Sequence, residues 1–102
     1  MPDTDSLTLT EASDAVLRID LRYRTLLNID DKEDLKPTRD QVFAAYTSAR
    51  LKLLEEGVMT TQADVDEMEA LRGEIEQAAE KQALIRGGVR VAGFLGRLAV
   101  RI

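Results

Sequence analysis

Two helical patterns meet in the stretch Leu53-Leu54-Glu55-Glu56-Gly57-Val58-Met59-Thr60-Thr61-Gln62-Ala63-Asp64. Gly57 predicts the end of the first helix, because glycine adopts a left-handed conformation there at the lowest cost. Thr61 and Asp64 predict the start of the second helix, since a threonine cap and an acid three residues later satisfy free backbone N–H groups. A connection this short joins antiparallel neighbours, so the sequence predicts a helical hairpin.

The hairpin is expected to span residues 38–86, with one helix over 38–56 and the other over 61–86. Pro37 marks its start, and Thr38 with Gln41 resembles a second capping pair. Apolar residues recur at helical spacing on both helices. On the first they are Val42, Tyr46, Ala49 and Leu53, and on the second Val65, Met68, Leu71, Ile75, Ala78, Ala79 and Ile85.

A further helix is predicted over residues 9–27, after a flexible polar lead at 1–7. Thr8 and Glu11 form its capping pair, and its apolar stripe consists of Ala12, Val16, Ile19, Tyr23 and Leu26. Leu17 and Leu21 lie off this stripe, so this helix is expected to contact a second neighbour. Leu51 likewise points away from the stripe of helix 38–56, which indicates a contact that another subunit could supply.

Residues 28–37 form the expected linker, which is rich in acids. A calcium loop beginning at Asp30 would need glycine at its sixth position and glutamate at its twelfth. The chain has Leu35 and Gln41 there, so an acidic, solvated turn is the better interpretation.

Composition limits the possible functions. A chain of 102 residues forms one small domain, and a core this poor in aromatic residues favours oligomerisation. The chain has no cysteine and no histidine, which removes thiol chemistry and the most frequent general base and metal ligand. We therefore expect no enzymatic activity, no cofactor and no metal. The acidic N-terminus does not resemble a secretory signal, and no apolar run is long enough to span a bilayer. These features predict a cytoplasmic protein.

The C-terminal segment 87–102 carries the clearest functional pattern. Residues 1–85 have ten basic and 19 acidic side chains, a net charge of −9, whereas residues 86–102 have four arginines and no acid. Arg86, Arg90, Arg97 and Arg101 share one face of a helix. Apolar residues that include Phe94, Leu95 and Leu98 complete a basic amphipathic segment, with Gly87–Gly88 as its expected hinge.

Two conformations remain open for this segment. Four glycines in ten residues disfavour a helix, and short period-two runs would suit strands that pair between subunits of an oligomer. Gly88 and Gly93 also match the glycine spacing of a phosphate-binding loop. Phe94 and Leu95 stand where that loop needs Lys and Ser or Thr, so a phosphate site is excluded.

The sequence as a whole therefore predicts an all-α fold, a small three-helix assembly with the 38–86 hairpin and a hinged tail. The expected function is a non-enzymatic oligomerisation or interaction protein. The tail, through its four arginines with Phe94, Leu95 and Leu98, would dock on a partner protein, an anionic membrane surface or nucleic acid, or would rest on acids of its own chain.

The combination of a 38–86 hairpin with a glycine-hinged, basic-apolar tail resembles the small terminase subunits of tailed phages in architecture. That resemblance implies a ring of subunits in DNA packaging, with the tail contacting the packaging motor. The chain lacks the N-terminal helix-turn-helix that many members use to bind DNA, which puts direct DNA recognition in doubt.

Overall fold

Four helices make up nearly all of the computed structural model, which describes residues 3–57 and 60–101. They are α1 (Thr4–Thr25), α2 (Ile29–Glu56), α3 (Gln62–Gln77) and α4 (Lys81–Ala99). The described residues contain no strand, so the all-α prediction is confirmed, and the C-terminal segment is helical rather than extended. Parts of the predicted lead and turn (residues 1–2 and 58–59) and residue 102 lie outside the described residues.

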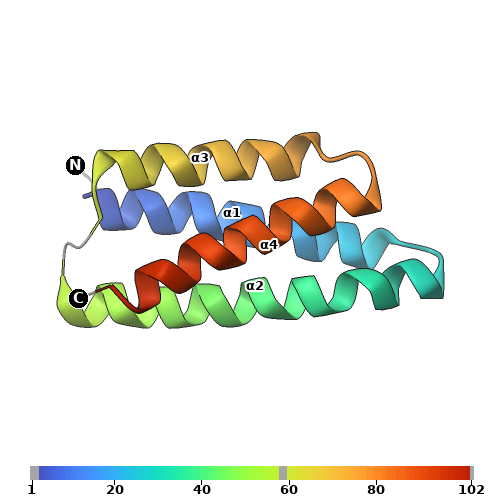
Figure 1. Ribbon diagram of the computed structural model, residues 1–102, viewed down its shortest axis with the longest axis horizontal. Helices are drawn as coiled ribbons and strands as arrows, with labels where there is room; N and C mark the ends of the chain where they lie inside the picture. The colour runs from blue at the N-terminus through green and yellow to red at the C-terminus, as the bar shows by residue number, and fades with distance from the viewer. Residues whose placement is uncertain (1–2, 58–59, 102) are drawn as a thin grey trace.

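The helices form an elongated bundle of 42 × 21 × 18 Å (Figure 1). α2 and α3 occupy opposite corners, with α1 and α4 between them, and among the described residues α2 and α3 make no direct packing contact. The predicted 38–86 hairpin is therefore not a packed pair, although its two helices do run in opposite directions. Instead α3 packs mainly on α1, and α2 packs mainly on α4, each in a parallel pair.

A buried polar contact explains why α3 begins beside α1. The carboxylate of Asp5 accepts hydrogen bonds from the backbone N–H of Thr60 (3.0 Å) and from its hydroxyl (2.6 Å). The hydroxyl of Thr4 donates in turn to the Thr60 carbonyl (2.9 Å). Because buried polar groups are costly without partners, this contact fixes the start of α3 next to α1. The predicted capping box is confirmed there, with Thr61 and Asp64 satisfying each other's backbone N–H groups.

Both early helices begin sooner than predicted. α1 starts at Thr4, because the carboxylate of Asp3 caps the backbone N–H of Ser6 (2.8 Å). α2 starts at Ile29, because the side chain of Asn28 caps Asp30 and Asp31. The predicted lead at residues 4–7 and the predicted linker at 29–37 are therefore helical.

Pro37 lies inside α2, although proline costs a helix interior about 3 kcal/mol. Tertiary contacts of the turns that precede it offset this cost. Leu35 is fully buried, and Lys81 of α4 forms ion pairs with Asp31 (3.0 Å) and Asp34 (2.6 Å) of the same segment. The capping pair predicted at Thr38 and Gln41 is wrong, because both residues lie in the middle of the helix.

The single helix predicted over 61–86 is broken at residues 78–80. Arg22 of α1 donates to the carbonyls of Ala78 and Ala79, which are freed where α3 ends. No glycine or proline lies at this break, and apolar residues keep their helical spacing across it. The sequence therefore gives no local indication that the helix ends there.

Gly87 and Gly88 are not a hinge, because both lie inside α4. A Cβ on Gly87 would stand 2.7 Å from the Cδ1 of Ile75, and one on Gly88 would stand 2.4 Å from the Cγ2 of Thr38. The glycine pair therefore allows α4 to approach α3 and α2 closely. The largest fully buried side chains around it include Phe94, Ile19, Leu35, Met68, Ile75, Leu84, Leu95 and Leu98.

Candidate interaction site

Of the four arginines predicted to bind a partner, Arg86, Arg90 and Arg97 lie on α4 and Arg101 lies just after it, and three of the four pair with acids of α3. Arg90 contacts Glu74 at 2.8 Å, Arg97 contacts Glu67 at 3.4 Å, and Arg101 contacts Asp64 at 2.7 Å. Arg86 is exposed and has no ion pair among the described residues. The structure thus brings most of this face against the acidic helix of its own chain.

The apolar part of the predicted binding segment is buried. Phe94, Leu95 and Leu98 are each at most 1% exposed and belong to the central core. A partner could reach them only if α4 left the bundle. In the folded bundle these three side chains complete the core, so their role in binding a partner stays a prediction.

The ion pairs between α3 and α4 perturb the groups that form them. Hydrogen bonding from Arg101 lowers the pKa of the Asp64 carboxyl below its ordinary value, and the same contact raises the pKa of Arg101. At the other end of α4, bonds to Asp34 and Asp31 raise the pKa of the Lys81 ammonium. These shifts have the direction expected where an ion pair favours the charged form of both partners.

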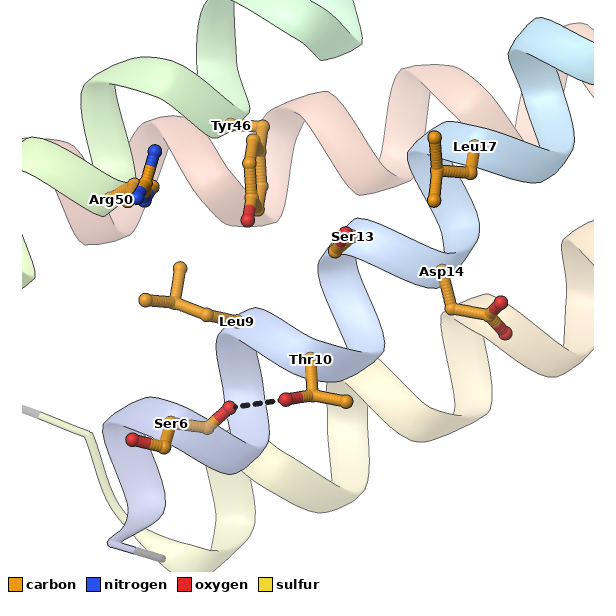
Figure 2. A pocket seen from close by; sticks show the side chains of 8 residues that line it. All are labelled: Ser6, Leu9, Thr10, Ser13, Asp14, Leu17, Tyr46 and Arg50. Atoms are coloured by element: carbon orange, nitrogen blue, oxygen red, sulfur yellow. Dashed lines mark hydrogen bonds between the residues drawn. The ribbon is translucent and has the colours of Figure 1, made fainter.

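An open groove lies on the opposite side of the molecule, between α1 and α2. Its α1 wall consists of Ser6, Leu9, Thr10, Ser13, Asp14 and Leu17, and its α2 wall consists of Tyr46 and Arg50. Its volume is about 550 Å³. Figure 2 shows Leu9 and Tyr46 pointing into the space between the two helices. α1 and α2 pack less extensively than α1 and α3 or α2 and α4, which leaves this space unfilled.

The groove continues past Ser6 and Leu9 toward the end of α2. A second hollow there shares these two residues and is also lined by Leu54 and Gly57. The hydroxyl of Thr10 donates to the Ser6 carbonyl (2.8 Å; Figure 2). The groove therefore combines apolar and polar lining residues, and the hydroxyl of Thr10 already has a partner.

The two charged residues of the groove differ in their surroundings. Asp14 is compensated by Arg18 (3.1 Å) and by Arg72 of α3 (3.6 Å). Arg50 is exposed and has no ion pair within residues 3–57 and 60–101. The groove thus presents an uncompensated positive charge on a chain whose net charge is −5.

Four exposed leucines lie on the two helices that form the groove. Leu17 and Leu21 on α1 are 60% and 61% exposed, and Leu51 and Leu54 on α2 are 56% and 68% exposed. All four lie on the outer faces of their helices. The off-stripe positions of Leu17, Leu21 and Leu51 were the sequence signal for this surface, whereas nothing in the sequence distinguishes Arg50 from any other surface arginine.

The described residues include no group of three or more side chains suited to hold a metal ion, and none of their helices is long and apolar enough to cross a membrane. No protein-family model, curated protein or solved structure matches this chain.

Proposed function

We propose that this chain is a non-enzymatic helical interaction protein, and that it docks its partner on the outer face of α1 and α2. We name this face the docking face and define it by Leu9, Leu17, Leu21, Tyr46, Arg50, Leu51 and Leu54. One observation carries the proposal. Arg50 has no ion pair among the described residues, and it lies on a face that also exposes more than half of Leu17, Leu21, Leu51 and Leu54. Clustered apolar residues with a polar rim mark protein-binding surfaces in small domains.

The chemistry of the docking face suits a helix as its partner. An apolar groove between two helices accepts the apolar side chains of an amphipathic helix at positions i, i+3 and i+4. Arg50 would pair with an acid of that helix, which adds orientation. A cytoplasmic setting is part of the proposal, because the chain has no cysteine and its fold uses no disulfide.

Docking through α4 is supported less well. An anionic membrane or nucleic acid would compete with Glu74, Glu67 and Asp64 for the arginines. Arg86 is the α4 arginine most available to such a partner. A single available arginine is a weak basis for anion binding, since affinity for phosphates grows with the number of neutralised charges.

The resemblance to small terminase subunits also has less support after the fold is known. It depended on a packed 38–86 hairpin and a hinged tail, whereas α2 and α3 lie at opposite corners and α4 belongs to the core. Our proposal therefore does not extend to a packaging ring.

The proposal can be tested with a displayed library of amphipathic helical peptides, selected against the full chain. Selected peptides are expected to carry an acid beside apolar residues at helical spacing. Leu17→Asp and Arg50→Gln should each weaken their binding by about tenfold, the effect of losing roughly 1.4 kcal/mol.

The matched control is Leu27→Asp, because Leu27 is 98% exposed and lies in the connection between α1 and α2. It should leave peptide affinity unchanged, as measured by fluorescence anisotropy. Failure to select any peptide, or selection of peptides that bind Leu17→Asp and Arg50→Gln as well as the wild type, would reject the docking face.

A further inference from the structure

We propose that α2 packs in parallel against α2 of a second copy of this chain, along the α2 edge of the docking face. This inference rests on the proposed function and names the partner of its α2 residues Arg50, Leu51 and Leu54. The contact would run along the outer face of α2 through Ala44, Thr47, Leu51 and Leu54, which we call the α2 seam. Each seam residue would meet the same residue of the second copy.

The α2 seam has the spacing of a two-stranded coiled coil. Its members are separated by three, four and three residues, the alternation of a and d positions in a heptad. All four are exposed, and they lie opposite the buried residues Val42, Ala49 and Leu53 of the same helix. α2 therefore has two apolar faces, of which one builds the core of the bundle and the other has no partner within the described chain.

Charges on the two flanks of the seam select the second copy and its direction. Arg50 precedes Leu51 on one flank, and Glu55 follows Leu54 on the other. Neither has an ion pair among the described residues, although the neighbouring Lys52 pairs with Glu56 at 3.3 Å. In parallel coiled coils a g residue faces the e residue five positions later on the partner helix. Arg50 and Glu55 stand in this relation, so a symmetric pair would form two Arg50–Glu55 contacts.

The opposite direction lacks these contacts. In an antiparallel pair, residues of the same flank meet, so Arg50 would not face Glu55 of the second copy and both ion pairs would be lost. The charge pattern thus favours a parallel arrangement.

The seam is short, which sets the strength of the association. One heptad earlier, the d position is Asp40, which is held by Lys36 (3.2 Å) and Arg39 (3.1 Å) of its own chain. Two copies would bring these carboxylates together, so the contact is limited to about residues 43–55. A contact of this size is typical of weak, reversible dimers, whose population depends on protein concentration.

The test is sedimentation velocity of the full chain over a range of concentrations. The wild type should show a monomer–dimer equilibrium that Leu51→Asp abolishes and Leu27→Asp leaves unchanged. Arg50→Glu and Glu55→Arg should each weaken dimerisation about tenfold. A single exposed ion pair contributes little, but each substitution turns both Arg50–Glu55 contacts of the symmetric dimer into repulsive pairs. The double variant should restore the wild-type affinity, and an equimolar mixture of the two single variants should form heterodimers.

The relative direction of the two α2 helices is tested by disulfide formation. Because the chain has no natural cysteine, only the introduced thiol can form a cross-link. Thr47→Cys should form a cross-linked dimer rapidly on mild oxidation, since a parallel seam places residue 47 beside its own copy. Ala70→Cys is the control, because Ala70 is exposed on α3 at the opposite corner of the bundle.

Several results would overturn the inference. A monomer at every concentration that still binds selected peptides through Leu17 would reject the second copy and leave the proposed function intact. A dimer that is insensitive to the charge reversals, or in which Thr47→Cys cross-links no faster than Ala70→Cys, would reject the α2 seam. A monomer that binds no peptide would reject both.

Discussion

The two long sides of this bundle use charge in different ways. On the side of α3 and α4, three arginines, Arg90, Arg97 and Arg101, meet three acids of α3. On the side of α1 and α2, Arg39 pairs with Asp20 at one end (2.9 Å), and the groove contains Arg50, which has no ion pair among the described residues. Both sides have surface hollows, so they differ in whether their arginines are already neutralised by the chain itself.

The largest expected effect contrasts a buried and an exposed apolar residue on these two sides. Ile75 of α3 is 1% exposed, so Ile75→Asp should lower the free energy of unfolding by about 4 kcal/mol or unfold the chain, because it buries an unpaired charge. Leu17→Asp should change it by no more than about 0.5 kcal/mol. Urea unfolding followed by circular dichroism measures both. Equal losses would show that Leu17 belongs to the core.

A smaller contrast concerns two glycines of α4. Gly88→Ala should destabilise the fold by about 1–3 kcal/mol, because its Cβ would stand 2.4 Å from Thr38 and both residues lie in helices. Gly96→Ala has nothing within 4 Å of its Cβ, so it should stabilise the helix by up to about 1 kcal/mol. Thermal unfolding of the two variants should move in opposite directions. A stabilised Gly88→Ala would contradict the close approach of α4 to α2.

The smallest effect concerns an ion pair of the α3–α4 side. Arg101→Gln should lower the free energy of unfolding by about 1 kcal/mol at neutral pH, since it removes the charged hydrogen bond that Arg101 donates to the Asp64 carboxylate. The pKa of Asp64 is lowered in the folded state, so this stabilisation is present above the unfolded pKa of about 4 and disappears as pH falls through the folded value.

Urea unfolding at several pH values checks this prediction. The difference between wild type and Arg101→Gln should shrink as the pH falls below about 4. Arg86→Gln is the matched control, because Arg86 has no ion pair among the described residues and should show no such difference. A difference that stayed constant in acid would mean that Asp64 is not the partner that matters.

Local sequence signals predicted the all-α fold and the apolar stripes, and they failed where distant contacts decide. The stripes predicted for the helices over 9–27, 38–56 and 61–86 are largely buried, and the capping box at Thr61 and Asp64 is present. Pro37 and Gly87–Gly88 were misread, because their usual effect on a helix is outweighed by neighbours far along the chain. The break at Ala78 depends on Arg22, which lies more than fifty residues earlier.

The candidate site was only partly predictable for a related reason. The arginine face of α4 is conspicuous in the sequence, but its pairing with α3 depends on how the two helices are placed. The exposed leucines were visible as departures from the stripes. Whether such a residue meets another helix of its own chain or remains exposed is decided by the arrangement of the bundle, which no local pattern encodes.

The diagonal placement of α2 and α3 has a consequence for how the chain could be divided. Each half of the molecule, α1 with α2 and α3 with α4, has its most extensive contacts with the other half rather than within itself. A cut between α2 and α3 would therefore produce two fragments that are poorly folded alone but complementary to each other. When the two fragments are mixed, we expect them to associate and to form the four-helix bundle again, although no covalent bond joins them.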